Sequence, residues 1–141
     1  MNLVRSYAPS DYNQVKKIYL KSDLYGGQFD DHRDSEERLK SRIEADPDAI
    51  LVAERDGNIV GTVSLIEDGR VAWLFRFAVL DTEAQDEVAT SLFDAAKEIL
   101  VGRGHHQILV YSPVGNENLN KRYKGLGFIK GNDYTCYWRN I

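Results

Sequence analysis

The stretch that decides the fold reads Asn116-Glu117-Asn118-Leu119-Asn120-Lys121-Arg122-Tyr123-Lys124-Gly125-Leu126-Gly127-Phe128. Leu119, Tyr123 and Leu126 recur at spacings of three and four, which predicts a short helix with one apolar face. Gly127 is expected to stop this helix, because glycine readily takes the left-handed conformation at a helix end, and Phe128 is expected to begin an apolar strand. The spacing alone fits a core tyrosine as well as a catalytic one.

Outward from this stretch, the chain alternates between strand and helix patterns without a repeat or a linker. Strands are predicted at residues 2–7, 49–55, 59–66, 71–80 and 108–111, followed by a closing hairpin of 128–130 and 134–138. Pro9 is expected to begin a first helix. A capping box of Asp34 and Glu37 is expected to begin a second helix, which runs to about residue 45. A long third helix is expected at residues 83–103.

The predicted order, β-α-α-β-β-β-α-β-α-β-β, describes a mixed α/β sheet with helices on both faces. Tight turns at Asp56-Gly57 and Asp68-Gly69 join the early strands as hairpins, which argues against a flavodoxin-like nucleotide-binding domain. The strand at 71–80 is nearly all apolar, so we expect it to be central and buried on both faces. A right-handed crossover should lead from it to the strand at 108–111.

Length and composition narrow the class of protein. With 141 residues, 43% hydrophobic and 28% charged, the chain suits one globular domain spanning residues 1–141. A net charge of −4 argues against binding to nucleic acid. We find no apolar run long enough for a signal peptide or a membrane span, so a cytoplasmic location is expected. The single cysteine, Cys136, excludes an internal disulfide, and its aromatic surroundings predict a buried, inert thiol.

The Asn116–Phe128 stretch resembles the C-terminal signature of the GCN5-related N-acetyltransferase (GNAT) family, N-x-x-A-x-x-x-Y-x-x-x-G-F. The predicted element order is similar to that of the family over essentially the whole chain. The resemblance implies that Tyr123 is the general acid that protonates the departing thiolate of coenzyme A. It also implies that Asn116 contacts the pantetheine arm, although an Asn at this position serves equally well as a helix N-cap.

The family holds the pyrophosphate of the cofactor with a loop of the form [QR]-x-x-G-x-[GA], whose glycines let backbone N–H groups approach the phosphates. A gapless alignment carries Ala84, Glu87 and Ala89 to the motif positions, and only Ala89 matches. A shift by one residue brings Gln85 to the first position but places Thr90 at the last. The residues that the resemblance assigns to acetyl-CoA are Phe77, Val79, Ala84, Gln85, Glu87, Ala89, Thr90 and Asn116.

Four acidic residues, Asp81, Glu83, Asp86 and Glu87, surround the predicted start of the long helix. Such residues stabilise a helix N-terminus, which is their common structural role. Two like charges about 4 Å apart at an effective dielectric constant of 20 repel by roughly 4 kcal/mol, so a diphosphate would bind here at a cost. The sequence therefore predicts impaired or altered cofactor binding.

Other candidate groups are less specific. The nearest carboxylates for a general base are Glu67 and Asp68, which also fit solvated turn residues. Tyr25, Phe29, Asp30 and Asp31 lie in the loop 23–34, which by resemblance would form a wall of the acceptor pocket suited to a cationic amine. His32, His105 and His106 have no partners at metal-ligand spacing, so no metal site is predicted.

Two functions stay open on the sequence. The first is an acyl-CoA-dependent N-acyltransferase that moves an acetyl group from acetyl-CoA to a small-molecule or peptide amine. The alternative is a catalytically inactive binding or regulatory module with the same fold. A homodimer is a further expectation, since sheet-edge dimers are common among proteins of this family.

Overall fold

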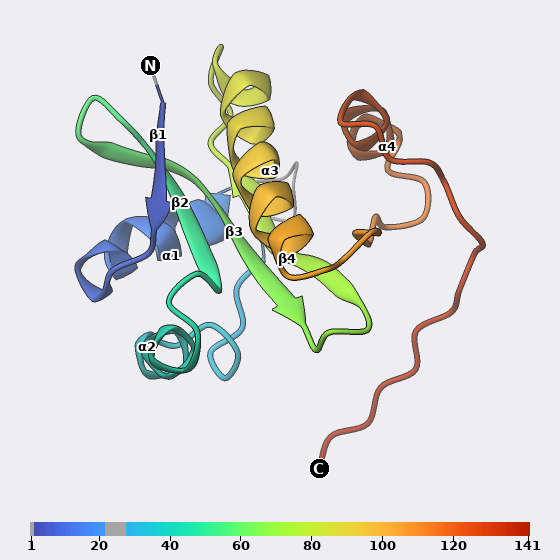
Figure 1. Ribbon diagram of the computed structural model, residues 1–141, viewed down its shortest axis with the longest axis horizontal. Helices are drawn as coiled ribbons and strands as arrows, with labels where there is room; N and C mark the ends of the chain where they lie inside the picture. Colours follow the sequence, from blue (N-terminus) through green and yellow to red (C-terminus); the bar gives the residue numbers. More distant parts are fainter. Residues whose placement is uncertain (1, 22–27) are drawn as a thin grey trace.

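The computed structural model describes residues 2–21 and 28–141. Within them, one antiparallel sheet has the strand order β1-β2-β3-β4, and the helices surround it (Figure 1). The strands are β1 (Leu3–Ser6), β2 (Ile50–Arg55), β3 (Asn58–Glu67) and β4 (Ala72–Val79). The helices are the 3₁₀ helix η1 (Pro9–Asp11) and the α-helices α1 (Tyr12–Lys21), α2 (Glu36–Ala45), α3 (Gln85–Gly102) and α4 (Glu117–Gly125).

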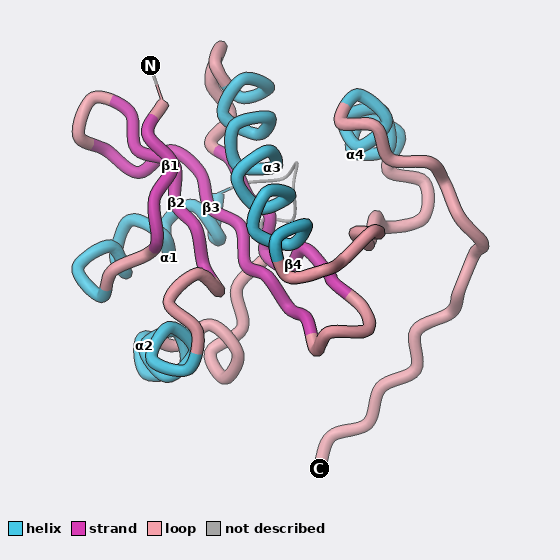
Figure 2. The backbone as a smooth tube through the Cα atoms, in the orientation of Figure 1, coloured by secondary structure: helices cyan, strands magenta, loops and turns pink. Residues whose placement is uncertain are grey.

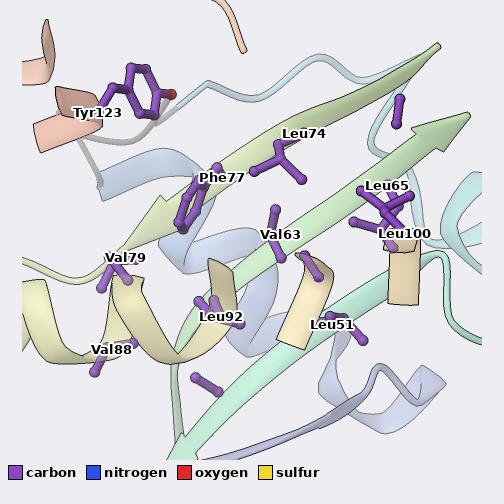
Figure 3. Close-up of a cluster of buried hydrophobic side chains, with 14 of the residues drawn as sticks. Leu51, Val63, Leu65, Leu74, Phe77, Val79, Val88, Leu92, Leu100 and Tyr123 are labelled. Atoms are coloured by element: carbon purple, nitrogen blue, oxygen red, sulfur yellow. The ribbon is translucent and has the colours of Figure 1, made fainter. Parts of the chain in front are cut away.

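The helices cover both faces of the sheet, as the sequence predicts. Val15, Ile18 and Tyr19 of α1 and Leu39 of α2 pack with one face of the strands. On the other face, α3 contributes a row of buried apolar residues (Figure 3), namely Val88, Ala89, Leu92, Ala96 and Leu100. The same cluster includes Leu119 and Tyr123 of α4, so both helices belong to one core.

The pairing of β3 with β4 contains a bulge opposite Val63. Thr62 pairs with Ala78 and Ser64 with Phe75, so Val63 alone faces two residues of β4. Arg76, one of these two, has φ 49°, a conformation that costs a non-glycine residue about 1–3 kcal/mol. Something in the fold must therefore hold Arg76 in place.

A buried ion pair supplies that restraint. Arg76 donates from Nε and Nη2 to the Asp34 carboxylate at 2.8–3.1 Å, and both side chains are almost fully buried. Nη1 of Arg76 donates to Gln28 Oε1 at 3.1 Å, and the guanidinium carbon lies 4.5 Å from the centre of the Phe75 ring. Asp34 also accepts from the Asp30 N–H at 2.8 Å. These bonds tie residues 28–34 to the bulge of β4.

This pairing corrects the predicted start of α2. The N-cap is Ser35, whose hydroxyl accepts from the Arg38 N–H at 3.2 Å, and the helix begins at Glu36. The predicted Asp34/Glu37 capping box was wrong because the carboxylate of Asp34 is used by Arg76, 42 residues away. Local sequence cannot reveal a partner at that separation.

The C-terminal part of the chain differs more from the prediction. The strand predicted at residues 108–111 is reduced to one parallel bridge, between Leu109 and Trp73. As a result β4 lies at the edge of the four-stranded sheet, whereas the sequence predicted a central strand. The closing hairpin of 128–130 and 134–138 was wrong, since residues 128–141, all of them described, contain no strand. Cys136 is exposed, not buried, because residues 129–141 pack against no other element. No helix in the described ranges has the length and apolarity to cross a bilayer.

We expect Gly61→Ala to destabilise the protein by about 1–3 kcal/mol, because α3 packs against β3 at this glycine with no room for a further methyl group. An added Cβ would lie 2.9 Å from Leu92 Cδ1 and Val88 Cγ1. Urea denaturation measures the free energy of unfolding. Gly102→Ala, where a Cβ would meet nothing within 4 Å, is the control and should be neutral or stabilising. Equal stability of the two variants would contradict the close approach.

We expect Asp34→Asn to cost about 3–5 kcal/mol of stability, because it leaves the buried Arg76 guanidinium without a counter-charge. Asp68→Asn, which breaks an exposed ion pair with Arg70, is the matched control and should cost at most about 1 kcal/mol. Thermal unfolding at pH 7 compares the two. A loss below about 1 kcal/mol in Asp34→Asn would show that the bulge does not depend on this pair.

Candidate active site

A cavity of about 490 Å³ lies between α3 and α4. Its walls are Asp86 and Thr90 of α3, Asn118, Lys121, Arg122 and Gly125 of α4, and Leu126. The N-terminal turn of α3 forms one side of the cavity. The first backbone N–H groups of a helix have no partner within the helix, and those of α3 therefore lie near the cavity. The cavity therefore joins a helix N-terminus to a basic helix face.

Of the predicted cofactor residues at the start of α3, only Thr90 lines this cavity, and the others have different surroundings. Ala84 is the N-cap of α3. Gln85 is buried, and its amide donates to the Val79 carbonyl at 3.2 Å, which locks the end of β4 to the start of α3. Ala89 is buried in the core, whereas Thr90 lines the cavity and donates to the Asp86 carbonyl at 2.8 Å.

Two of the acidic residues at the helix start have basic partners. Asp86 forms an ion pair with Arg122 across the cavity, from α3 to α4. Glu87 lies 3.8 Å from Nη1 of Arg55, at the end of β2. The sequence places these carboxylates together and predicts repulsion of an anion. In the folded chain, two of these carboxylates are paired with arginines that are distant in sequence.

Tyr123 and Asn116 are both positioned by α4. Tyr123 is 8% exposed and packs edge-on against Phe128, with ring centres 5.6 Å apart. It belongs to the same buried cluster as Phe77 and Val79, and Figure 3 shows its hydroxyl directed away from α4. Asn116 caps the helix, since its side-chain oxygen accepts from the Leu119 N–H at 3.0 Å. Tyr123 thus shares one buried cluster with the second half of β4, and its sequence neighbour Arg122 lines the cavity.

Glu67 and Asp68 lie at the wrong end of the sheet for a general base. Glu67 pairs with Ala72 at the start of β4, about 23 Å along the strand from Val79. The hydrogen bond from His105, at 2.8 Å, lowers the pKa of Glu67, and Arg70 lowers the pKa of Asp68 to about 2. Both carboxylates already serve structural ion pairs.

The predicted acceptor loop is described only in part. Tyr25 lies outside the described residues. Phe29 is half-buried, with the Lys16 ammonium 5.0 Å from its ring centre. Asp30 and Asp31 are exposed, and the Asp30 carboxylate accepts from the backbone of His32 and Arg33. The segment borders the face of β4 that carries the Arg76 bulge.

The residues that the sequence reasoning missed are the basic groups on α4. Asn118, Lys121, Arg122 and Gly125 recur at spacings of three and four, so they share the helix face that lines the cavity. The pattern was visible in the sequence. The sequence did not reveal that this face lines a cavity, because only the fold places it opposite the start of α3.

The chain is similar to known acetyltransferases in sequence and in fold. The chain is 27% identical over 114 residues to an acetyltransferase of Photorhabdus laumondii, covering 81% of this chain and 77% of that protein. It shares its fold with the PaiA N-acetyltransferase of Thermoplasma acidophilum in complex with coenzyme A (18% identity, TM-score 0.72, 89% and 88% coverage). It also resembles the aminoglycoside 6'-N-acetyltransferase AAC(6')-Ih of Acinetobacter baumannii (14% identity, TM-score 0.74, 100% and 99% coverage).

The family assignment follows from the length of the sequence match. The sequence model of the acetyltransferase (GNAT) family matches residues 12–128, which include β4, the whole of α3 and α4, and Tyr123. Acetyl-CoA is accordingly the cosubstrate, and acyl transfer is the class of reaction. The chain belongs to the GNAT family of acetyltransferases.

Proposed function

We propose that this protein transfers the acetyl group of acetyl-CoA to the amine of a small molecule or a peptide, and that the basic face of α4 binds the phosphates of the cosubstrate. The observation that carries the proposal is the cavity between α3 and α4, where Lys121 and Arg122 face the start of α3. The cosubstrate supplies the activated acetyl group. The protein supplies counter-charge, alignment and a proton.

In this proposal, the positive charges of Lys121 and Arg122 take the role of the glycine-rich phosphate loop of the family. Glu87 and Val88 stand where glycine would let the backbone close on a diphosphate. Lys121 and Arg122 can instead approach the phosphates from α4, and a guanidinium forms paired hydrogen bonds with phosphate oxygens. A phosphate in the cavity would compete with Asp86 for Arg122, so binding is expected to be weakened and not abolished.

The proton comes from Tyr123 in this proposal. The amine nitrogen forms a bond to the acetyl carbon, the carbon–sulfur bond breaks, and the phenol of Tyr123 gives its proton to the leaving thiolate. The amine loses its own proton to water. The presence of Tyr123 in the same buried cluster as Phe77 and Val79 supports this role, because the end of β4 is where the thioester would lie in a member of this family.

We expect Arg122→Ala to weaken acetyl-CoA binding by about 10- to 100-fold, which is what the loss of one charged hydrogen bond, roughly 1.5–3 kcal/mol, amounts to. Asp86→Asn should strengthen binding, because it releases Arg122. Isothermal titration calorimetry with acetyl-CoA measures both effects. Lys124→Ala changes a basic residue of the same helix that does not line the cavity, and it should bind as the wild type does. Unchanged affinity in Arg122→Ala would reject the phosphate role of α4.

We expect Tyr123→Phe to lower kcat by about 100-fold or more while KM for acetyl-CoA stays the same, since only the proton donor is removed. The assay follows the release of free thiol from acetyl-CoA with a panel of aminoglycosides, polyamines and peptide amines, and a reaction without acceptor sets the background. An unaltered kcat would remove Tyr123 from the mechanism. No thiol release with any amine, together with no cofactor binding, would favour the inactive binding module.

A further inference from the structure

Two stacked aromatic side chains lie on the face of the sheet that α3 does not cover. The rings of Trp73, on β4, and Tyr111 have centres 4.6 Å apart and planes inclined by 29°. Trp73 is half-buried, whereas the described part of the chain leaves 76% of Tyr111 exposed. The contact with Trp73 occupies one face of the Tyr111 ring. The other face is open to a further ring, and offset stacking is a favourable arrangement for such a contact.

The edge of the sheet determines the position of this pair. Ala72 and Leu74 point into the core under α3, so Trp73, which lies between them, points to the opposite face. The chain between α3 and α4, drawn as loop in Figure 2, meets this edge at Leu109, whose N–H donates to the Ala72 carbonyl at 2.9 Å. Leu109 is bridged to Trp73 and shares its face. Tyr111, two residues later, therefore reaches the same face.

The surroundings of the pair are apolar. Ile66 of β3 is the cross-strand neighbour of Trp73, and Val71 lies two residues before Trp73; each is 46% exposed. Asp68 and Arg70, in the preceding turn, form an ion pair with each other. An amino sugar needs polar side chains that bind its hydroxyl groups, because polar groups fix the orientation of a ligand. Aliphatic neighbours favour a flat apolar ring instead.

A hydrogen bond connects this pair to the helix that carries Tyr123. The hydroxyl of Ser112, the residue after Tyr111, donates to Oδ1 of Asn120 at 2.6 Å. Asn120 and Tyr123 are three residues apart on α4, so their side chains are neighbours on the helix surface. The aromatic pair is therefore separated from the proposed proton donor by one residue, one hydrogen bond and one turn of helix.

We propose that Tyr111 and Trp73 bind a flat aromatic ring of the acceptor, and that the substrates are amines joined to such a ring by a short chain. This inference rests on the proposed acetyl transfer and names its acceptor class. The ring stacks on the open face of Tyr111, and the chain carries the amine toward α4. There the nitrogen bonds to the acetyl carbon, the carbon–sulfur bond breaks, Tyr123 protonates the thiolate, and the amine loses a proton to water.

A fluorescence titration tests ring binding without any acetyl transfer. The chain has two tryptophans, so Trp138→Phe leaves Trp73 as the only indole. Nitrophenethylamine, whose ring quenches indole fluorescence on contact, should quench Trp73 saturably, and the titration is run with and without coenzyme A. Adding Tyr111→Leu should raise the apparent Kd at least about 5-fold, because it removes the stacking ring. Quenching that never saturates, or a Kd that Tyr111→Leu leaves unchanged, would overturn the proposal.

Two further variants separate ring stacking from a general effect of substitution. Tyr111→Phe keeps the ring and should keep the apparent Kd within about twofold of its value before this substitution. Tyr137→Leu changes an exposed tyrosine in the segment 129–141 and should have no effect on the titration. An equal rise in Kd for Tyr111→Phe and Tyr111→Leu would contradict stacking.

Acceptor kinetics test the substrate class. Thiol release from acetyl-CoA should give a kcat/KM for phenethylamine at least about 5-fold above the values for hexylamine and glucosamine. Tyr111→Leu should remove most of this preference by raising KM for phenethylamine, with little change in kcat. A preference for glucosamine, or a preference for phenethylamine that survives in Tyr111→Leu, would reject the ring subsite.

The two measurements distinguish failure of this inference from failure of the proposed function. Thiol release with amines that shows no preference for phenethylamine would reject the ring subsite and keep the transferase. Saturable quenching that depends on Tyr111, together with no thiol release from any amine, would reject the transferase and support the ring subsite.

Discussion

The contact between Asp34 and Arg76 determines the course of β4, the strand that leads into α3. Arg76 sits at a bulge in a left-handed conformation, and the cost of that conformation is met by a buried, hydrogen-bonded ion pair. The bulge sets the direction of Phe77, Ala78 and Val79, whose side chains enter the cores on the two faces of the sheet. The same pair fastens residues 28–34 beside the bulge. One interaction thus positions both the strand and the segment that borders it.

The charge distribution at the start of α3 depends on tertiary contacts as well as on the local sequence. Four acidic residues lie within seven positions and suggest a site that repels anions. Folding brings Arg122 from α4 and Arg55 from β2 to two of them. The local field then depends on pairs and not on the acidic residues alone. Under the proposed function, a phosphate in this cavity would replace Asp86 as the partner of Arg122, which costs less than facing uncompensated negative charge.

The C-terminal end of the chain departs most from the sequence-based expectation. Residues 105–108 and 126–128 border a groove of about 240 Å³ over the C-terminal half of α3, and residues 129–141 are exposed along their whole length. The closing strands that the sequence predicts do not form in the described part of the chain, because these residues pair with no neighbouring strand there. An apolar strand pattern alone does not supply the partner that a strand needs.

The sequence by itself determined the order of the first elements, the hairpin at Asp56-Gly57, the apolar face of α3 and the family signature that ends in Phe128. These depend on periodicity, turn chemistry and helix ends, which act over a few residues. Only the tertiary structure decided that Asp34 binds Arg76 and not the helix α2, that Gln85 turns inward to Val79, and that Lys121 and Arg122 face the start of α3. Each of these contacts forms because separate elements pack together and bring the partner groups within hydrogen-bonding or ion-pairing distance. The partner of each side chain therefore depends on where the strands and helices meet, and a short window of sequence does not contain that information.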